Sequence, residues 1–176
     1  ILFVGTISPS KNLVRLIKAF KEVNKMNKKL KLVIVGKNGW KFEDVYKTVE
    51  EFKLNDSVIF TGYVSDDELE SLYKKAMFVV YPSLYEGFGL PPLEAMSRDK
   101  SVLVSDIPVL KEILGDAAFY FNPYDEEDMV KHILNLTSNK EYRNSKREVA
   151  SKTVNLYSWE KCAQKTYNVY EKLMGE

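Results

Sequence analysis

Short apolar runs alternate along the chain with stretches whose apolar residues recur at helical spacing. The run at residues 32–35 is apolar throughout, as is typical of a strand that is covered on both faces. Runs of this kind predict strands at residues 1–4, 32–35, 58–60, 77–81, 102–104 and 118–121.

The stretches between these runs predict helices. The first buries one apolar face, formed by Leu13, Leu16, Ile17, Phe20 and Val23. Residues 42–52 predict a second helix, and the Ser-Asp-Asp-Glu run at residues 65–68 is typical of a capping box. From residue 125 onward the pattern predicts two or three helices, the last starting at Ser158.

Alternation of strand and helix favours parallel pairing with right-handed crossovers. The predicted fold is therefore α/β, a Rossmann-like doubly wound parallel sheet of about six strands followed by C-terminal helices. One domain covers residues 1–176. The chain opens directly on an apolar run, so we expect another domain to precede it in the parent protein.

Composition excludes several classes of function. A formal net charge of +1 over 176 residues gives no basic surface for nucleic acid, so no nucleic-acid partner is expected. No apolar run is long enough to cross a bilayer. Cys162 is the only cysteine, so an internal disulfide is impossible; a cytoplasmic location is expected, with Cys162 buried in the last helix.

Residues 82–96 carry the clearest chemical signal. They follow the predicted fourth strand, and ligands of such sheets bind beyond the carboxyl ends of the strands. Gly87 and Gly89 allow a close backbone approach or a positive φ. Pro91 and Pro92 suit the first turn of a helix, so we expect a helix to start at about Pro92. Its free amides suit a phosphate group.

Two carboxylates flank this turn. From local physics alone, Glu94 is either a ligand group or an acid in the first helical turn that satisfies backbone amides. Glu86 has no local partner and is either a ligand group or a solvated loop acid. The acidic run at residues 125–128 is better explained by favourable charge at a helix N-terminus than by a metal site.

The spacing of Glu86 and Glu94, together with the residues between them, resembles the Glu-x7-Glu signature of glycosyltransferase family 4, the group 1 glycosyltransferases. The opening loop at residues 4–13, the strand exit at 60–64, the segment at 105–118 and the Tyr-Ser-Trp at 157–159 resemble other parts of that family. The resemblance implies a two-domain GT-B fold, of which this chain is the C-terminal, donor-binding domain.

The resemblance also implies roles for individual residues. Glu94 would accept hydrogen bonds from ribose hydroxyls, and Glu86 would contact the transferred sugar. Lys11 would neutralise the pyrophosphate, so Glu86 and Lys11 are the catalytic candidates. The remaining donor-binding candidates are the amides around Gly89 and Leu90 for the distal phosphate, Tyr63 and Val64 for the base, and Gly5, Gly87 and Phe88.

The implied activity is retaining transfer of a hexose from a nucleotide sugar to a glycan or lipid-linked acceptor, as in polysaccharide biosynthesis. GDP-mannose is the first candidate donor, because the opening loop resembles mannosyltransferase-like members. The alternatives are a UDP-sugar donor, or a non-catalytic nucleotide-sugar-binding or scaffold module. No metal or other cofactor is expected. The missing domain would bind the acceptor, and the full-length protein could sit at the inner face of the membrane.

At two positions the sequence has a neutral residue where the family often has a cationic one. Thr6 and Ser10 stand where members often carry arginine, which leaves Lys11 without a guanidinium companion. Arg15, one helical turn further on, is a possible substitute, although Lys11 and Arg15 could equally form a solvated face.

Overall fold

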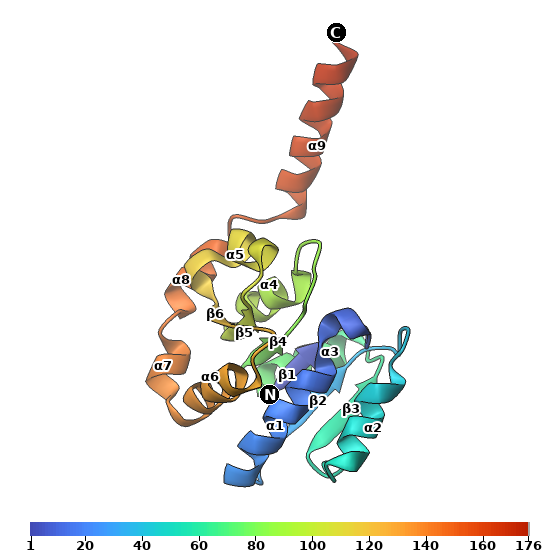
Figure 1. Cartoon of the computed structure of the whole chain (residues 1–176). Helices are drawn as coiled ribbons and strands as arrows, with labels where there is room; N and C mark the ends of the chain where they lie inside the picture. The colour runs from blue at the N-terminus through green and yellow to red at the C-terminus, as the bar shows by residue number, and fades with distance from the viewer. Residues whose placement is uncertain (176) are drawn as a thin grey trace.

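A computed structural model describes residues 1–175, and it contains one parallel six-stranded sheet in the order β3-β2-β1-β4-β5-β6 (Figure 1). All neighbouring strands pair in parallel. The strands are β1 (Leu2–Val4), β2 (Leu32–Val35), β3 (Val58–Gly62), β4 (Val79–Tyr81), β5 (Val102–Ser105) and β6 (Phe119–Phe121). The predicted fold class is confirmed, and every predicted strand is present with ends shifted by at most two residues.

The order of the strands reverses between β1 and β4. The chain leaves β1 toward β2 and β3, then returns to the other side of β1 and continues through β4, β5 and β6. In sheets of this kind, ligands bind beyond the carboxyl ends of the strands at the point where the strand order reverses, so the loops that leave β1 and β4 are the expected site. This topology brings the two segments that carry the candidate residues to one place.

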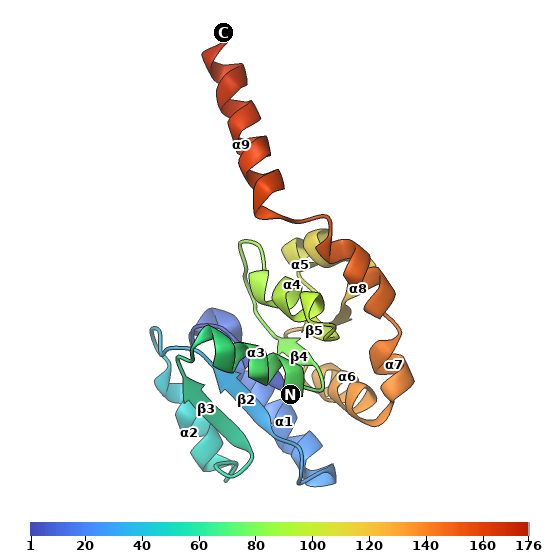
Figure 2. The same cartoon turned by 180° about the vertical axis from the view of Figure 1, so that it is seen from behind.

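Helices cover both faces of the sheet. α1 contacts α2 and α6 on one face, and α4 contacts α8 on the other (Figures 1 and 2). Within residues 1–175 the helices are α1 (Leu13–Met26), α2 (Glu43–Glu51), α3 (Asp66–Lys75), α4 (Leu90–Ser97), α5 (Pro108–Leu114), α6 (Glu126–Ser138), α7 (Lys140–Asn144), α8 (Arg147–Val154) and α9 (Trp159–Met174), with the short 3-10 turns η1 (Pro9–Lys11) and η2 (Gly115–Ala117).

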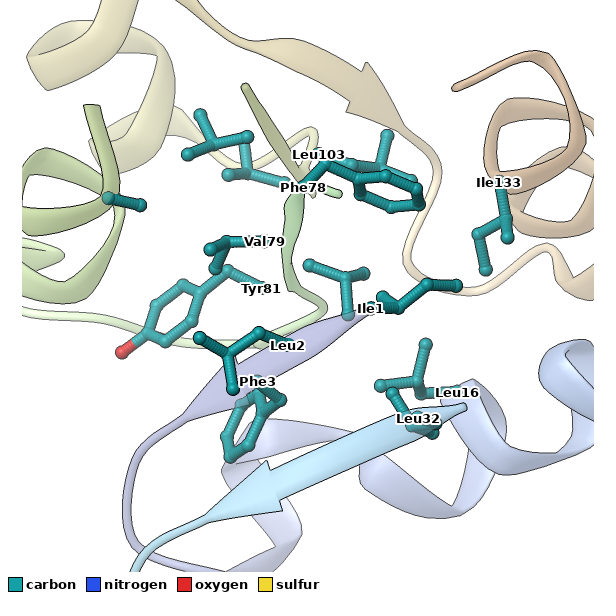
Figure 3. Packing of buried hydrophobic residues seen from close by; sticks show 14 of the residues in the cluster. Ile1, Leu2, Phe3, Leu16, Leu32, Phe78, Val79, Tyr81, Leu103 and Ile133 are labelled. Atoms are coloured by element: carbon teal, nitrogen blue, oxygen red, sulfur yellow. The ribbon is translucent and has the colours of Figure 1, made fainter. Parts of the chain in front are cut away.

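The core lies on both sides of the central strands. Figure 3 shows Phe3 of β1 and Val79 of β4 in one cluster with Leu16 of α1 and Ile133 of α6. Tyr81 belongs to this cluster, and its ring stacks on Phe3 with centroids 5.9 Å apart. Its hydroxyl is directed away from the apolar side chains (Figure 3). The core therefore fixes a polar atom at the end of β4.

Capping and turn chemistry explain where helices begin. Ser65 and Glu68 form the predicted capping box of α3, and the side chain of Asp125 accepts hydrogen bonds from the amides of Glu127 and Asp128 at the start of α6. The predicted start of the helix at about Pro92 is wrong: α4 begins at Leu90. Prolines fit its first turn because the amides that they lack would have no helical partner there.

The last helix departs from the body of the domain. α9 starts after Ser158, as predicted, but it extends away from the sheet (Figures 1 and 2). None of its residues is buried, and the expectation that Cys162 is buried is wrong. Over residues 1–175, no helix has the length and apolar character needed to span a membrane.

Candidate functional site

The loop after β1 lies against the end of β2. The Gly5 amide donates to the Val35 carbonyl oxygen over 2.9 Å. At Gly36, an added Cβ atom would lie 2.0 Å from the Gly5 carbonyl oxygen, so only glycine allows the two backbones to approach this closely. Sequence reasoning selected Gly5 and missed Gly36, whose position directly after a strand was the available signal.

Lys11 projects from the same loop. It ends η1, and Asn12 then takes a left-handed conformation with φ 57° before α1 begins at Leu13. Lys11 therefore lies before the first α-helix and not in it. The Lys11 and Asn12 amides bond to Ser8 and Pro9 within the turn, so they are not free for a ligand.

Lys11 and Glu86 form an ion pair. The Lys11 Nζ atom lies 2.5 Å from Glu86 Oε1 and donates to the Tyr81 hydroxyl over 3.2 Å. The side chain of Glu86 is 10% exposed. That low exposure contradicts the alternative of a solvated loop acid. Glu86 has no local partner, as the sequence indicated, and its partner Lys11 is distant in sequence.

Tyr81 is the residue of this cluster that sequence reasoning missed. Burial, and next the negative charge of Glu86, raise the pKa of its hydroxyl well above the usual value. The hydroxyl therefore stays protonated and, as a neutral group, accepts a hydrogen bond from the ammonium beside the carboxylate. A tyrosine at the last position of a strand, before a glycine loop, was the signal that could have indicated it.

The glycine loop at residues 82–89 is tied to its surroundings at both ends. The Leu84 amide donates to the Ser10 carbonyl oxygen over 2.8 Å, which joins this loop to the loop after β1. The ring of Phe88 packs edge-on against Tyr157, with centroids 5.6 Å apart. Gly89 has φ 98°, a conformation that side chains other than glycine rarely adopt.

The amides at the start of α4 are available for a ligand. Among residues 1–175, no hydrogen-bond partner is found for the backbone amides of Gly87, Phe88, Gly89 and Leu90. Pro91 and Pro92 carry no amide hydrogen, so the free donors are concentrated just before the helix. Together with the helix dipole, these amides suit a phosphate group.

Glu94 lies in the second turn of α4, not in the first as predicted. It is too far into the helix to satisfy the first backbone amides, so the capping alternative is wrong. The residue is exposed, and its Oε2 atom accepts a hydrogen bond from the buried Tyr73 hydroxyl over 3.2 Å. Sequence reasoning did not predict the contact between Tyr73 and Glu94.

Tyr63 and Val64 follow β3 and line an open groove of about 520 Å³. The ring of Tyr63 is 72% exposed, and the Lys37 ammonium lies 4.8 Å from its centroid. The rest of the lining comes from Thr61 and from Asp67, Glu68, Ser71, Leu72 and Lys75. An exposed aromatic ring beside an open groove is a surface on which a base could stack.

Arg15 does not lie with Lys11 and Glu86. Its guanidinium donates to Asn12 Oδ1 and to the Pro123 carbonyl oxygen, beyond the end of β6. The Ser10 hydroxyl lies 3.1 Å from that of Ser8, and Thr6 is exposed. The possible substitution of Arg15 for a missing arginine finds no support in these contacts.

No metal centre is found in the described part of the chain: no three side chains of His, Cys, Asp or Glu are grouped there as a metal ion would need. The acidic run at the start of α6 serves instead as a helix cap, through Asp125.

Comparison with known proteins identifies the family. The sequence model of the family described as "Glycosyl transferases group 1" matches residues 1–153. The chain belongs to the group 1 glycosyltransferases.

Two curated relatives of similar sequence are mannosyltransferases. The chain is 34% identical to the O-antigen chain mannosyltransferase B of Escherichia coli over 98% of its own length and 45% of the relative. It is 41% identical to the O-antigen chain mannosyltransferase RfbU of Salmonella typhimurium over 77% of its length and 37% of the relative. The chain thus spans less than half the length of these relatives.

A solved structure has the same fold as this chain. The sucrose-phosphate synthase of Thermosynechococcus elongatus superposes with a TM-score of 0.86 at 24% identity, over 99% of this chain and 45% of the other. Such a match shows that this chain has the fold of part of that synthase.

Proposed function

We propose that this chain is the donor-binding part of a retaining glycosyltransferase, and that Lys11, Glu86 and the amides before α4 form the donor site. The observation that carries the proposal is their convergence where the strand order reverses, between β1 and β4. An ammonium and free amides stabilise the negative charge that grows on a departing diphosphate. This chemistry needs no metal ion.

The two glutamates would divide the recognition of the donor. Glu86 belongs to the loop that faces Lys11, so it is suited to hydroxyls of the sugar next to the diphosphate. Glu94 is exposed and carries a fixed carboxylate, so it is suited to the ribose. Ribose diols and carboxylates form charge-assisted hydrogen bonds, which are stronger than neutral ones.

GDP-mannose is our first candidate for the donor. The two relatives named above are mannosyltransferases. The groove beside Tyr63 also carries Asp67, whose carboxylate could accept from the adjacent ring N–H and amino groups of guanine. Uracil offers only one such donor. The acceptor is proposed to be a glycan or a lipid-linked glycan, bound outside this chain.

The proposal is tested by isothermal titration of the chain with GDP, UDP, GDP-mannose and UDP-glucose. We expect GDP and GDP-mannose to bind more tightly than their uridine counterparts. Tighter binding of the uridine ligands would show that the base is uracil and not guanine, and it would leave the proposed donor site unchanged. Absence of binding by all of these ligands would contradict the donor-binding function and favour a scaffold role.

A further inference from the structure

Tyr73 is buried completely, yet its hydroxyl bonds to a side chain at the surface. It lies on α3 with 0% exposure, and its hydroxyl donates to Glu94 Oε2 over 3.2 Å. Burial, and next the charge of Glu94, raise the pKa of Tyr73 above its usual value, so the hydroxyl stays a donor. An exposed glutamate is thereby bonded to the rigid interior of the domain.

The ring of Tyr73 is held from a second side. The Arg98 guanidinium lies 4.9 Å from the ring centroid. Arg98 is itself fixed by Glu70 Oε2 at 2.5 Å and by the carbonyl oxygen of Glu94 at 2.9 Å. α3 and α4 are therefore joined by contacts that surround Tyr73, and its hydroxyl has little freedom to move.

Only one oxygen of Glu94 is used in these contacts. Within residues 1–175, no group donates to Glu94 Oε1, and the residue is exposed. A free glutamate side chain loses rotamer entropy when a ligand orders it. A carboxylate that is already fixed through one oxygen avoids most of that loss and presents the other to a ligand.

We propose that Tyr73 is a positioning residue that fixes the carboxylate of Glu94 for the ribose hydroxyls of the donor. The inference rests on the proposed function and deepens it. Tyr73 does not touch the ligand; it acts through Glu94. The simpler explanation is that Glu94 merely satisfies a buried hydroxyl, and the two explanations differ in what a ligand lacking its ribose hydroxyls would show.

The test compares GDP with 2′,3′-dideoxy-GDP by titration on the unchanged chain and on Tyr73→Phe. Phenylalanine keeps the ring and its contact with Arg98 and removes only the hydroxyl. We expect Tyr73→Phe to weaken GDP about three- to tenfold and dideoxy-GDP less than twofold. Tyr120→Phe is the matched control, since it removes a hydroxyl that bonds to the Gly115 carbonyl oxygen over 2.7 Å; it should change neither affinity.

A double-mutant cycle with Glu94→Ala completes the test. If Tyr73 acts through Glu94, Tyr73→Phe should cause no further loss of GDP affinity in the Glu94→Ala chain. Additive losses, an equal loss for both nucleotides, or no loss for either would overturn the positioning role and leave the proposed function intact. If the unchanged chain binds neither GDP nor UDP, the proposed function fails and this inference fails with it. If UDP binds more tightly, the same cycle is run with UDP and its dideoxy analogue.

Discussion

The ammonium of Lys11 and the carboxylate of Glu86 lie 2.5 Å apart, although they come from loops that follow different strands. Each is the other's partner while no ligand is bound. A nucleotide sugar that contacts Lys11 through its diphosphate and Glu86 through its sugar must therefore either bind to both residues while their ion pair persists or break that ion pair. The pair makes the two candidate catalytic residues dependent on each other.

Exchange of Glu86 for glutamine should raise the affinity for GDP. The change removes the carboxylate that competes for the Lys11 ammonium, and an ion pair of modest exposure is worth about 1 kcal/mol, or about fivefold in affinity. GDP-mannose should gain less or lose affinity, because the sugar loses its acceptor. Titration of both ligands checks this; weaker GDP binding by Glu86→Gln would show that Glu86 supports the diphosphate site.

Lys11→Ala should nearly abolish GDP binding. A charge-assisted contact to the diphosphate contributes about 1.5–3 kcal/mol, and no arginine accompanies Lys11. Higher salt should weaken binding by the unchanged chain, because a partly exposed contact is screened. Lys18→Ala is the matched control, since Lys18 lies in α1 and faces Glu126 at 3.7 Å. Equal affinities of the Lys11→Ala and unchanged chains would limit Lys11 to its ion pair with Glu86.

Ser10→Arg should strengthen GDP binding. Ser10 stands in the opening loop at a position where the family resemblance leads us to expect arginine, and its carbonyl oxygen already bonds to the Leu84 amide of the glycine loop. A guanidinium there would add a second cation for the diphosphate, with a fork that matches phosphate geometry. Titration with GDP at two salt concentrations measures the gain. An unchanged affinity would place position 10 outside the reach of the diphosphate.

Gly89→Ala should destabilise the domain by about 1–3 kcal/mol. At φ 98° a side chain is strained, and the added Cβ atom would lie 2.7 Å from Leu110 Cδ2. Gly87→Ala is the control, because no atom lies within 4 Å of its added Cβ. Urea denaturation of both variants measures the difference. Equal stabilities would mean that the glycine loop relaxes freely at Gly89.

Removal of α9 by ending the chain at Tyr157 should leave the melting temperature unchanged to within about 2 °C. None of the residues of α9 is buried, whereas Tyr157 bonds to the Ile113 carbonyl oxygen over 3.0 Å and is retained. Ending the chain before Arg147 should clearly lower the melting temperature, because Ala150 of α8 is buried. A large loss on removing α9 alone would reveal packing of that helix against the domain.

The sequence by itself determined the fold class and singled out the segment that carries most of the candidate site. Continuous apolar runs separated by amphipathic stretches allow only a sheet covered on both faces, and Glu86, Gly89 and Glu94 belong to one contiguous segment. Local chemistry also fixed the caps at Ser65 and Ser158, since these hydrogen bonds span only a few residues.

Only the tertiary structure decided which partners these residues have. Strand order brings Lys11 beside Glu86 and Tyr81, 70 or more positions away, and the packing of α3 on α4 brings Tyr73 to Glu94. The start of α4 at Leu90 depended on the left-handed turn at Gly89, and the exposure of Cys162 depended on where α9 points. Such contacts join distant segments, and neither residue spacing nor local propensity encodes them.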